Sequence, residues 1–165
     1  MKKFALLFII LCSCSQNNPK KTYDFTTVFE KSEGKETATY EETILYYKNL
    51  AQAYPEISIN SIGETDSGKP LHLVTLNPDK VFDFSQIRAN NKRILLINNG
   101  IHPGESDGID ATMLLYRDIA QGTIDMPKHT VLATIPIYNI GGSLNRNSTT
   151  RTNQNGPVSY GFRGN

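Results

Sequence analysis

Hydrophobic residues recur at helical spacing in the stretch that opens at Thr39 and stops at Pro55. Apolar residues three and four positions apart share one helix face; here they are Ile44, Leu45, Tyr47, Leu50 and Ala51. Thr39 followed by Glu42 three residues later is the pattern of a capping box. The pattern therefore predicts an amphipathic helix between Thr39 and Pro55.

Two stretches that follow have the pattern of strands. Apolar and polar residues alternate over residues 57–63, as in a half-buried strand, and residues 71–76 form a second apolar stretch. Between them, residues 66–70 contain the Gly and Pro typical of a turn.

The middle of the chain changes from a short apolar run to a loop and then to a helical pattern. Within residues 93–98, positions 94–97 form a continuous apolar run, which predicts a strand buried on both faces. A loop rich in Gly and Pro follows over residues 99–105, then a helix over about 106–122 and another buried strand over 130–137. This order predicts an α/β fold with a mixed, largely parallel central sheet flanked by helices.

The last part of the chain, residues 138–165, lacks any periodic apolar pattern and is rich in Asn, Thr, Gly and Arg. A long stretch without secondary structure is unusual in a compact domain unless it is functional. Because the sequence stops in what reads as the middle of a loop, we expect it to be a truncated domain.

Composition and charge exclude some classes of function. The chain has 165 residues, 38% of them hydrophobic, and 17 Lys and Arg against 16 Asp and Glu give a net charge of +1. This length and composition indicate one globular domain. Without a basic excess, we expect no nucleic-acid partner.

The N-terminal residues are typical of an export signal. Lys2 and Lys3 precede an apolar run over residues 4–11, which is too short to span a bilayer as a helix. The next residues resemble a bacterial lipobox, in which a small residue precedes the lipidated Cys. Cys14 follows the small Ser13, whereas Cys12 follows Leu11, so Cys14 fits better.

This resemblance predicts a lipoprotein exported to the bacterial cell envelope and associated with a membrane through a lipid on Cys14. Residues 1–14 would form the signal region, 15–38 a polar tether and 39–165 the catalytic domain. The mature chain would then contain no second cysteine for a disulfide. In the other interpretation, the two cysteines near the N-terminus have no role.

His102 and Glu105 follow the predicted strand over residues 93–98, where ligands commonly bind in α/β sheets. Imidazole nitrogen and carboxylate oxygen are common zinc ligands, and the intervening Pro103 and Gly104 would turn the chain so that both side chains face one point. Spacing alone is a weak signal. Glu105 could instead be a first-turn helix carboxylate, with His102 bonded to backbone.

The context of this pair resembles the zinc carboxypeptidase family, the relatives of carboxypeptidase A. Family members place His-x-x-Glu between a buried strand and a helix, often as His-Pro-Gly-Glu, the letters of residues 102–105. Residues 62–71 resemble the family's turn between its first two strands. Residues 135–142 match a later strand end and turn in placement, but lack the Pro and Asp of the family's turn. Gly104 also stands where some members have Arg.

The resemblance implies a metallocarboxypeptidase that binds one Zn²⁺ and hydrolyses C-terminal bonds of a peptide substrate. His102 and Glu105 would be two of the three metal ligands, and Arg151 would stabilise the oxyanion, with Arg146 as its competitor. The family's third ligand, a His, and its general base, a Glu, cannot be assigned in the sequence, so we expect this chain alone to be inactive. His72 and His129 are not expected to be ligands.

Two other functions remain open from the sequence. A zinc amidohydrolase or deacylase of the same fold would act on acylated amino acids or cell-wall peptides. A non-catalytic envelope lipoprotein would bind peptides on the same scaffold. In either case, a truncated sheet would expose a hydrophobic strand edge, which favours association and poor solubility. Oligomeric state and side-chain specificity are not predicted.

Overall fold

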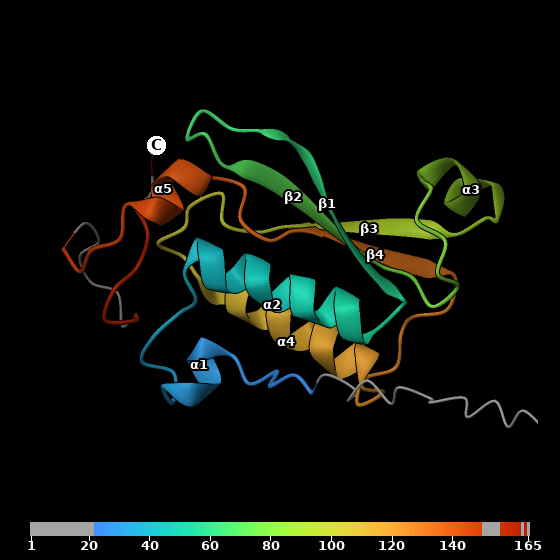
Figure 1. Cartoon of the computed structure of the whole chain (residues 1–165), viewed down its shortest axis with the longest axis horizontal. Coiled ribbons are helices and arrows are strands. Elements are labelled where there is room, and N and C mark those ends of the chain that lie inside the picture. Colours follow the sequence, from blue (N-terminus) through green and yellow to red (C-terminus); the bar gives the residue numbers. More distant parts are fainter. Residues whose placement is uncertain (1–21, 150–155, 163, 165) are drawn as a thin grey trace, which may run out of the picture.

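Four strands form one mixed sheet in the order β1-β2-β4-β3, with helices packed beside it. The computed structural model describes residues 22–149, 156–162 and 164. Its elements are α1 (Val28–Lys31), α2 (Tyr40–Ala53), β1 (Ile57–Glu64), β2 (Pro70–Leu76), α3 (Phe84–Ala89), β3 (Arg93–Asn98), α4 (Asp107–Ala120), β4 (Thr130–Ile135) and α5 (Ile140–Leu144). Figure 1 shows α2 and α4 side by side along one face of the sheet.

The predicted α/β class is confirmed, and the pairings define the sheet more closely. β1 and β2 form an antiparallel hairpin, β2 also pairs antiparallel with β4, and β3 pairs parallel with β4. The described strands therefore form a mixed sheet in which one of the three pairings is parallel.

Helix α2 starts at the capping box that the sequence predicts. The Thr39 side chain accepts a hydrogen bond from the Glu42 amide, and the Glu42 carboxylate accepts one from the Thr39 amide. The apolar face of α2 packs on α4 and the sheet; there, the fully buried rings of Tyr47 and Tyr116 meet edge to face with centroids 5.6 Å apart. Among the described residues, no helix combines the length and hydrophobicity needed to cross a bilayer.

The prediction that residues 93–98 form a strand buried on both faces is wrong. β3 lies at the edge of the described sheet, and Leu95 and Leu96 are 53% and 54% exposed. The central position belongs to β4, which lies between β2 and β3 and is buried from Val131 to Ile135. A continuous apolar run is compatible with burial on both faces, but it does not show which neighbours cover the strand.

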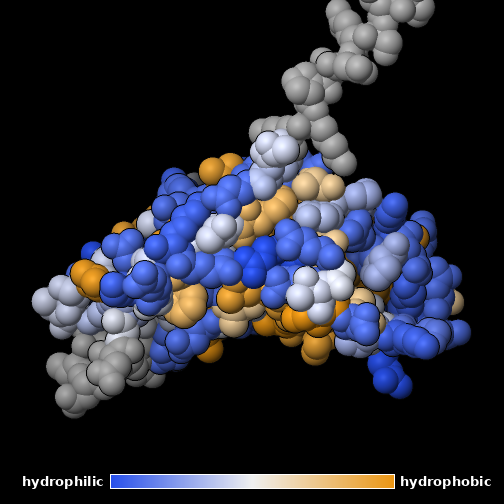
Figure 2. Space-filling model, turned by 90° about the horizontal axis from the view of Figure 1, so that it is seen from below, coloured by the Kyte–Doolittle hydropathy of each residue, from blue (hydrophilic) through white to orange (hydrophobic). Residues whose placement is uncertain are grey.

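Figure 2 shows hydrophobic residues interrupting the polar surface on the face seen from below.

Residues 22–38 do not form a tether, contrary to the interpretation of their composition. This part of the predicted tether packs against α2 and α4, with Thr27, Thr37 and Ala38 no more than 4% exposed. Helix α1 begins with its own capping box, formed by Thr27 and Glu30. Residues 15–21 and Cys14 lie outside the described residues.

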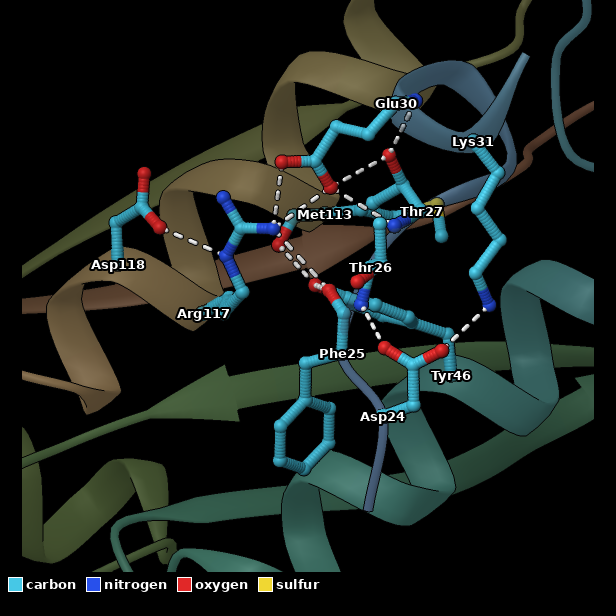
Figure 3. Close-up of polar contacts among 10 residues, drawn as sticks. All are labelled: Asp24, Phe25, Thr26, Thr27, Glu30, Lys31, Tyr46, Met113, Arg117 and Asp118. Carbon is cyan, nitrogen blue, oxygen red and sulfur yellow. Dashed lines mark hydrogen bonds and ion pairs between the residues drawn. The ribbon is translucent and has the colours of Figure 1, made fainter.

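The Arg117 guanidinium joins α4 to α1 and to the segment before α1 (Figure 3). Its Nη1 donates to both carboxylate oxygens of Glu30, at 2.9 and 2.7 Å, and to the carbonyl oxygen of Phe25 at 3.1 Å. Its Nε donates to Asp118 at 2.8 Å. Burial of Glu30 would raise its pKa, but the hydrogen bonds from Arg117 and Thr27 outweigh burial and hold that pKa below its ordinary value.

Replacing Arg117 by Leu should therefore loosen residues 22–36. Hydrogen bonds to charged groups contribute roughly 1.5–3 kcal/mol, so we expect the free energy of unfolding to fall by about 2 kcal/mol. Urea denaturation measures the loss, and limited proteolysis should show faster cleavage before Thr37. Arg88→Leu is the matched control, because Arg88 is an exposed helical Arg. Equal stability of the two variants would contradict the role given to Arg117.

Candidate functional site

The loop that carries His102 is held at its start by backbone hydrogen bonds that continue beyond β3. The amide of Asn99 donates to the carbonyl oxygen of Ile135 at 3.1 Å. In return, the amides of Tyr138 and Asn139 donate to the carbonyl oxygens of Asn99 and Gly100, at 2.8 and 2.9 Å. The loop therefore leaves the sheet in a fixed direction.

Gly100 is required where the loop leaves the sheet. Its φ is +61°, a left-handed conformation that side chains other than Gly rarely adopt. A Cβ at this position would lie 3.1 Å from both Cα and Cγ2 of Ile137. Close packing and backbone conformation thus both favour glycine two residues before His102.

The buried side chain of Asn99 connects three elements beneath the loop. Its Nδ2 donates to Oγ1 of Thr112 in α4 at 2.9 Å and to Oγ1 of Thr134 in β4 at 3.3 Å. The Thr134 hydroxyl donates in turn to the carbonyl oxygen of Ile97 in β3 at 2.9 Å. Sequence reasoning missed this network. The available signal was an Asn directly after an apolar run, with Thr inside two buried elements.

The His-Pro-Gly-Glu segment forms the tight turn that its sequence predicts. The Glu105 amide donates to the His102 carbonyl oxygen at 2.8 Å, which closes a four-residue turn with Pro103 and Gly104 at its centre. The His102 Nδ1 and Glu105 Oε2 atoms lie 3.7 Å apart, and the side chains are 34% and 47% exposed. The turn therefore places the His102 nitrogen and the Glu105 carboxylate oxygen on one side, where both are accessible.

The geometry of this pair fits a zinc ion. Two ligand atoms in tetrahedral positions about 2.05 Å from zinc lie about 3.4 Å apart, close to the observed separation. One imidazole nitrogen and one carboxylate oxygen are also donor types that zinc binds readily. Within the described ranges, no group of three or more His, Cys, Asp or Glu side chains could hold a metal, so the pair is part of a ligand set at most.

The other two histidines lie in or next to strands. His72 is 8% exposed in β2, and its Nδ1 lies 3.4 Å from the Tyr40 hydroxyl. Burial, with a smaller effect of Lys48, lowers the pKa of His72. His129 directly precedes β4, and because β3 and β4 are parallel, it lies at the opposite end of the strands from the His102 loop.

Arg146 serves the structure of the neighbouring loops. Its guanidinium donates to the carbonyl oxygens of Thr37, Ala38 and Ser159, at 3.1, 3.4 and 2.6 Å. Because these three hydrogen bonds occupy the guanidinium of Arg146, it is not free to bind an oxyanion. This argues against Arg146 as the residue that stabilises the oxyanion. Arg151, the preferred candidate, lies outside the described residues.

The segment over residues 156–162 packs directly against the His102–Glu105 turn. A Cβ on Gly161 would lie 2.7 Å from Cβ of Pro103 and 3.0 Å from the Gly142 carbonyl oxygen. The Phe162 amide donates to that same carbonyl at 2.8 Å, and Tyr160 pairs with Asn147 as an isolated bridge. Residues 160–162 therefore lie close to the His102 turn and pair with Asn147.

An open groove of about 540 Å³ lies beside Ile101, the residue that precedes His102. Residues from the β1–β2 turn, the His102 loop and the chain after β4 line it: Thr65, Asp66, Leu71, Ile101, Tyr138, Asn139 and Ile140. Ile101 and Tyr138 are both 51% exposed. An extended segment could therefore lie against apolar surface immediately beside His102.

Comparison with known proteins identifies a family and a fold. The sequence pattern of a family described as zinc carboxypeptidase matches residues 43–157. A solved carboxypeptidase A from Helicoverpa armigera superposes with a TM-score of 0.56 at 17% identity, covering 66% of this chain and 26% of the other. Bovine thrombin-activatable fibrinolysis inhibitor, solved with a tick carboxypeptidase inhibitor, gives 0.50 at 17% identity, covering 62% and 31%. No curated protein matches the chain.

These structural likenesses support the fold, and the chain spans only about a quarter to a third of the length of the solved chains.

The contact between Gly161 and Pro103 can be tested by adding one methyl group. Gly161→Ala should force the turn or the 156–162 segment to move, because overpacking costs about 1–3 kcal/mol. We expect a lower melting temperature and weaker binding of zinc to the full-length protein. Gly156→Ala is the control, because a Cβ there meets no atom within 4 Å. A Gly161→Ala variant as stable as Gly156→Ala would show that the contact does not constrain the turn.

Proposed function

Because the chain belongs to the zinc carboxypeptidase family, we propose that the full-length protein is a zinc-dependent carboxypeptidase that removes C-terminal residues from peptides. The observation that carries this proposal is the His102–Glu105 turn, which presents a nitrogen and an oxygen donor 3.7 Å apart. The family match over residues 43–157 includes both residues.

In this proposal, His102 and Glu105 hold the zinc together with a third ligand that the described residues do not supply. Zinc at this place supplies a Lewis acid that polarises a carbonyl group and acidifies water. Arg151 would place a fixed positive charge beside the developing oxyanion, where one such donor contributes about 2.7–4 kcal/mol. The general base would also come from outside the described residues, so we expect residues 1–165 alone to be inactive.

The groove beside Ile101 offers a place for the substrate chain. Its exposed apolar side chains would contact residues upstream of the bond that is cleaved. A deacylase of the same fold is the second candidate, because Gly104 stands where some relatives have Arg and the turn therefore lacks that charged side chain.

For the N-terminal region, we propose export to the bacterial cell envelope and lipidation of Cys14, supported by the lipobox-like sequence around it. Cys14→Ser should abolish incorporation of labelled palmitate in a bacterial host and move the protein from the membrane to the soluble fraction. Cys12→Ser is the matched control and should keep both properties. Palmitate labelling that survives Cys14→Ser would refute this assignment.

The metal and the reaction can be tested in the full-length protein. His102→Ala and Glu105→Ala should each reduce bound zinc to background in elemental analysis, whereas His129→Asn should retain it because His129 lies at the opposite end of the strands. Asn is chosen because His129 has a φ of +59°, which Asn tolerates.

The wild-type protein should cleave peptides with a free C-terminus and leave C-terminally amidated peptides intact. Unchanged zinc content in His102→Ala would refute the metal site. Zinc-dependent cleavage of amidated peptides or N-acyl amino acids would instead favour the deacylase.

A further inference from the structure

The Arg146 guanidinium bridges two segments that lie far apart in the sequence. On one side, its Nη2 and Nη1 donate to the carbonyl oxygens of Thr37 and Ala38, at 3.1 and 3.4 Å. On the other side, Nη2 donates to the carbonyl oxygen of Ser159 at 2.6 Å. A planar guanidinium presents its N–H donors in a rigid fork, so it can join two backbone segments in a defined geometry.

The first of these segments is fixed to helix α4. The Thr37 hydroxyl donates to the Asp110 carboxylate at 2.5 Å, and both residues are no more than 5% exposed. The Ala38 amide also donates to Asp110. A second link joins the two segments directly, since the Val158 amide donates to the Lys35 carbonyl oxygen at 2.9 Å. Figure 1 shows the chain after α5 beside the chain that connects α1 to α2.

The second segment leads to the turn that presents His102 and Glu105. Gly161 comes two residues after Ser159, and a Cβ on it would lie 2.7 Å from Cβ of Pro103 at the centre of the turn. Pro103 and Gly161 are both buried. A displacement of Ser159 would therefore remove support from the buried side of the turn.

The bridge contains a half-buried cation that acidic side chains balance. Burial lowers the pKa of the Arg146 guanidinium, and the negative charges of Glu42, Asp110 and Glu36 oppose this effect. Burying a charged group costs free energy unless partners compensate it. The surrounding carboxylates therefore favour a cation over a neutral side chain at this position.

We propose that Arg146 is a positioning residue for the His102–Glu105 turn and acts on it through residues 159–161. The proposal rests on the zinc-binding role proposed for this turn. Residues 35–38, which the sequence composition assigned to a tether, are in this arrangement part of the support of the candidate metal site. Groups that orient metal ligands without touching the metal commonly change metal affinity about tenfold to hundredfold when they are removed.

The turn can be followed without zinc through the Glu105 amide, which donates to the His102 carbonyl oxygen. In the metal-free full-length protein, Arg146→Gln should speed hydrogen exchange of this amide at least about tenfold, because the turn then opens more often. The Asn99 amide, which is bonded to β4, should keep its exchange rate, whereas a general loss of stability would speed both. Arg88→Gln is the matched control, because it removes the same charge from an exposed helical position.

Zinc affinity of the full-length protein provides the second measurement. Arg146→Gln should weaken zinc binding about tenfold, although loss of a positive charge alone would favour a bound cation. If Arg146→Gln fails to fold, Arg146→Lys takes its place. It keeps the charge, but one ammonium group cannot reproduce the guanidinium fork, so the same two changes are expected.

The two proposals fail in different ways. If the wild-type protein binds no zinc, the proposed function fails, while the exchange experiment still decides whether Arg146 holds the turn. Unchanged exchange of the Glu105 amide in a folded Arg146 variant would overturn the positioning role and leave the metal site standing.

Discussion

The parallel pairing of β3 with β4 continues past the last residue of β3, and the candidate site depends on this extension. Asn99 donates to the last residue of β4, and Asn99 and Gly100 accept hydrogen bonds from the chain after β4, although neither belongs to a strand. The chain then leaves the sheet at a glycine in a left-handed conformation. This geometry determines where His102 lies relative to the sheet.

Beneath this loop, the Asn99 side-chain amide donates to Thr134 of β4 and Thr112 of α4, which joins the strand to the helix. Gly108 allows this close approach, because a Cβ there would lie 2.7 Å from Asn99 Oδ1. Helix α4 packs in the core through Ile109, Met113 and Tyr116. Other residues of its first turns, among them Asp110 and Ala111, line a cavity of about 290 Å³.

Local patterns in the sequence predicted much of the fold and the form of the candidate turn. Three of these features depend on residues within a few positions of one another: the α2 capping box, the β1–β2 hairpin and the Pro103–Gly104 turn. The local sequence is therefore enough to predict them. The edge position of β3 could not be predicted, because an apolar run does not identify its neighbours. The polar composition of residues 22–38 concealed their packing, since the partner that holds them, Arg117, lies far along the chain.

The same distinction applies to the candidate site. His102 and Glu105 were found because their spacing is local, whereas the Asn99 network joins residues 13 and 35 positions apart. Arg146 remained a catalytic candidate in the sequence because nothing near it shows that its guanidinium binds three backbone carbonyls. The sequence pattern does not identify the long-range hydrogen-bond partners of polar side chains.

The position of β4 in the sheet has a consequence for the kinetics of folding. The β1–β2 hairpin joins neighbouring segments, but β4 must find β2 across a long stretch of chain, as in the pairing of Leu76 with Leu132. Closing such a loop loses conformational entropy before contacts compensate, which slows this step. The pairing of β3 with β4 on which the His102 loop depends is also long-range, since Arg93 lies opposite Thr130, 37 positions further along the chain.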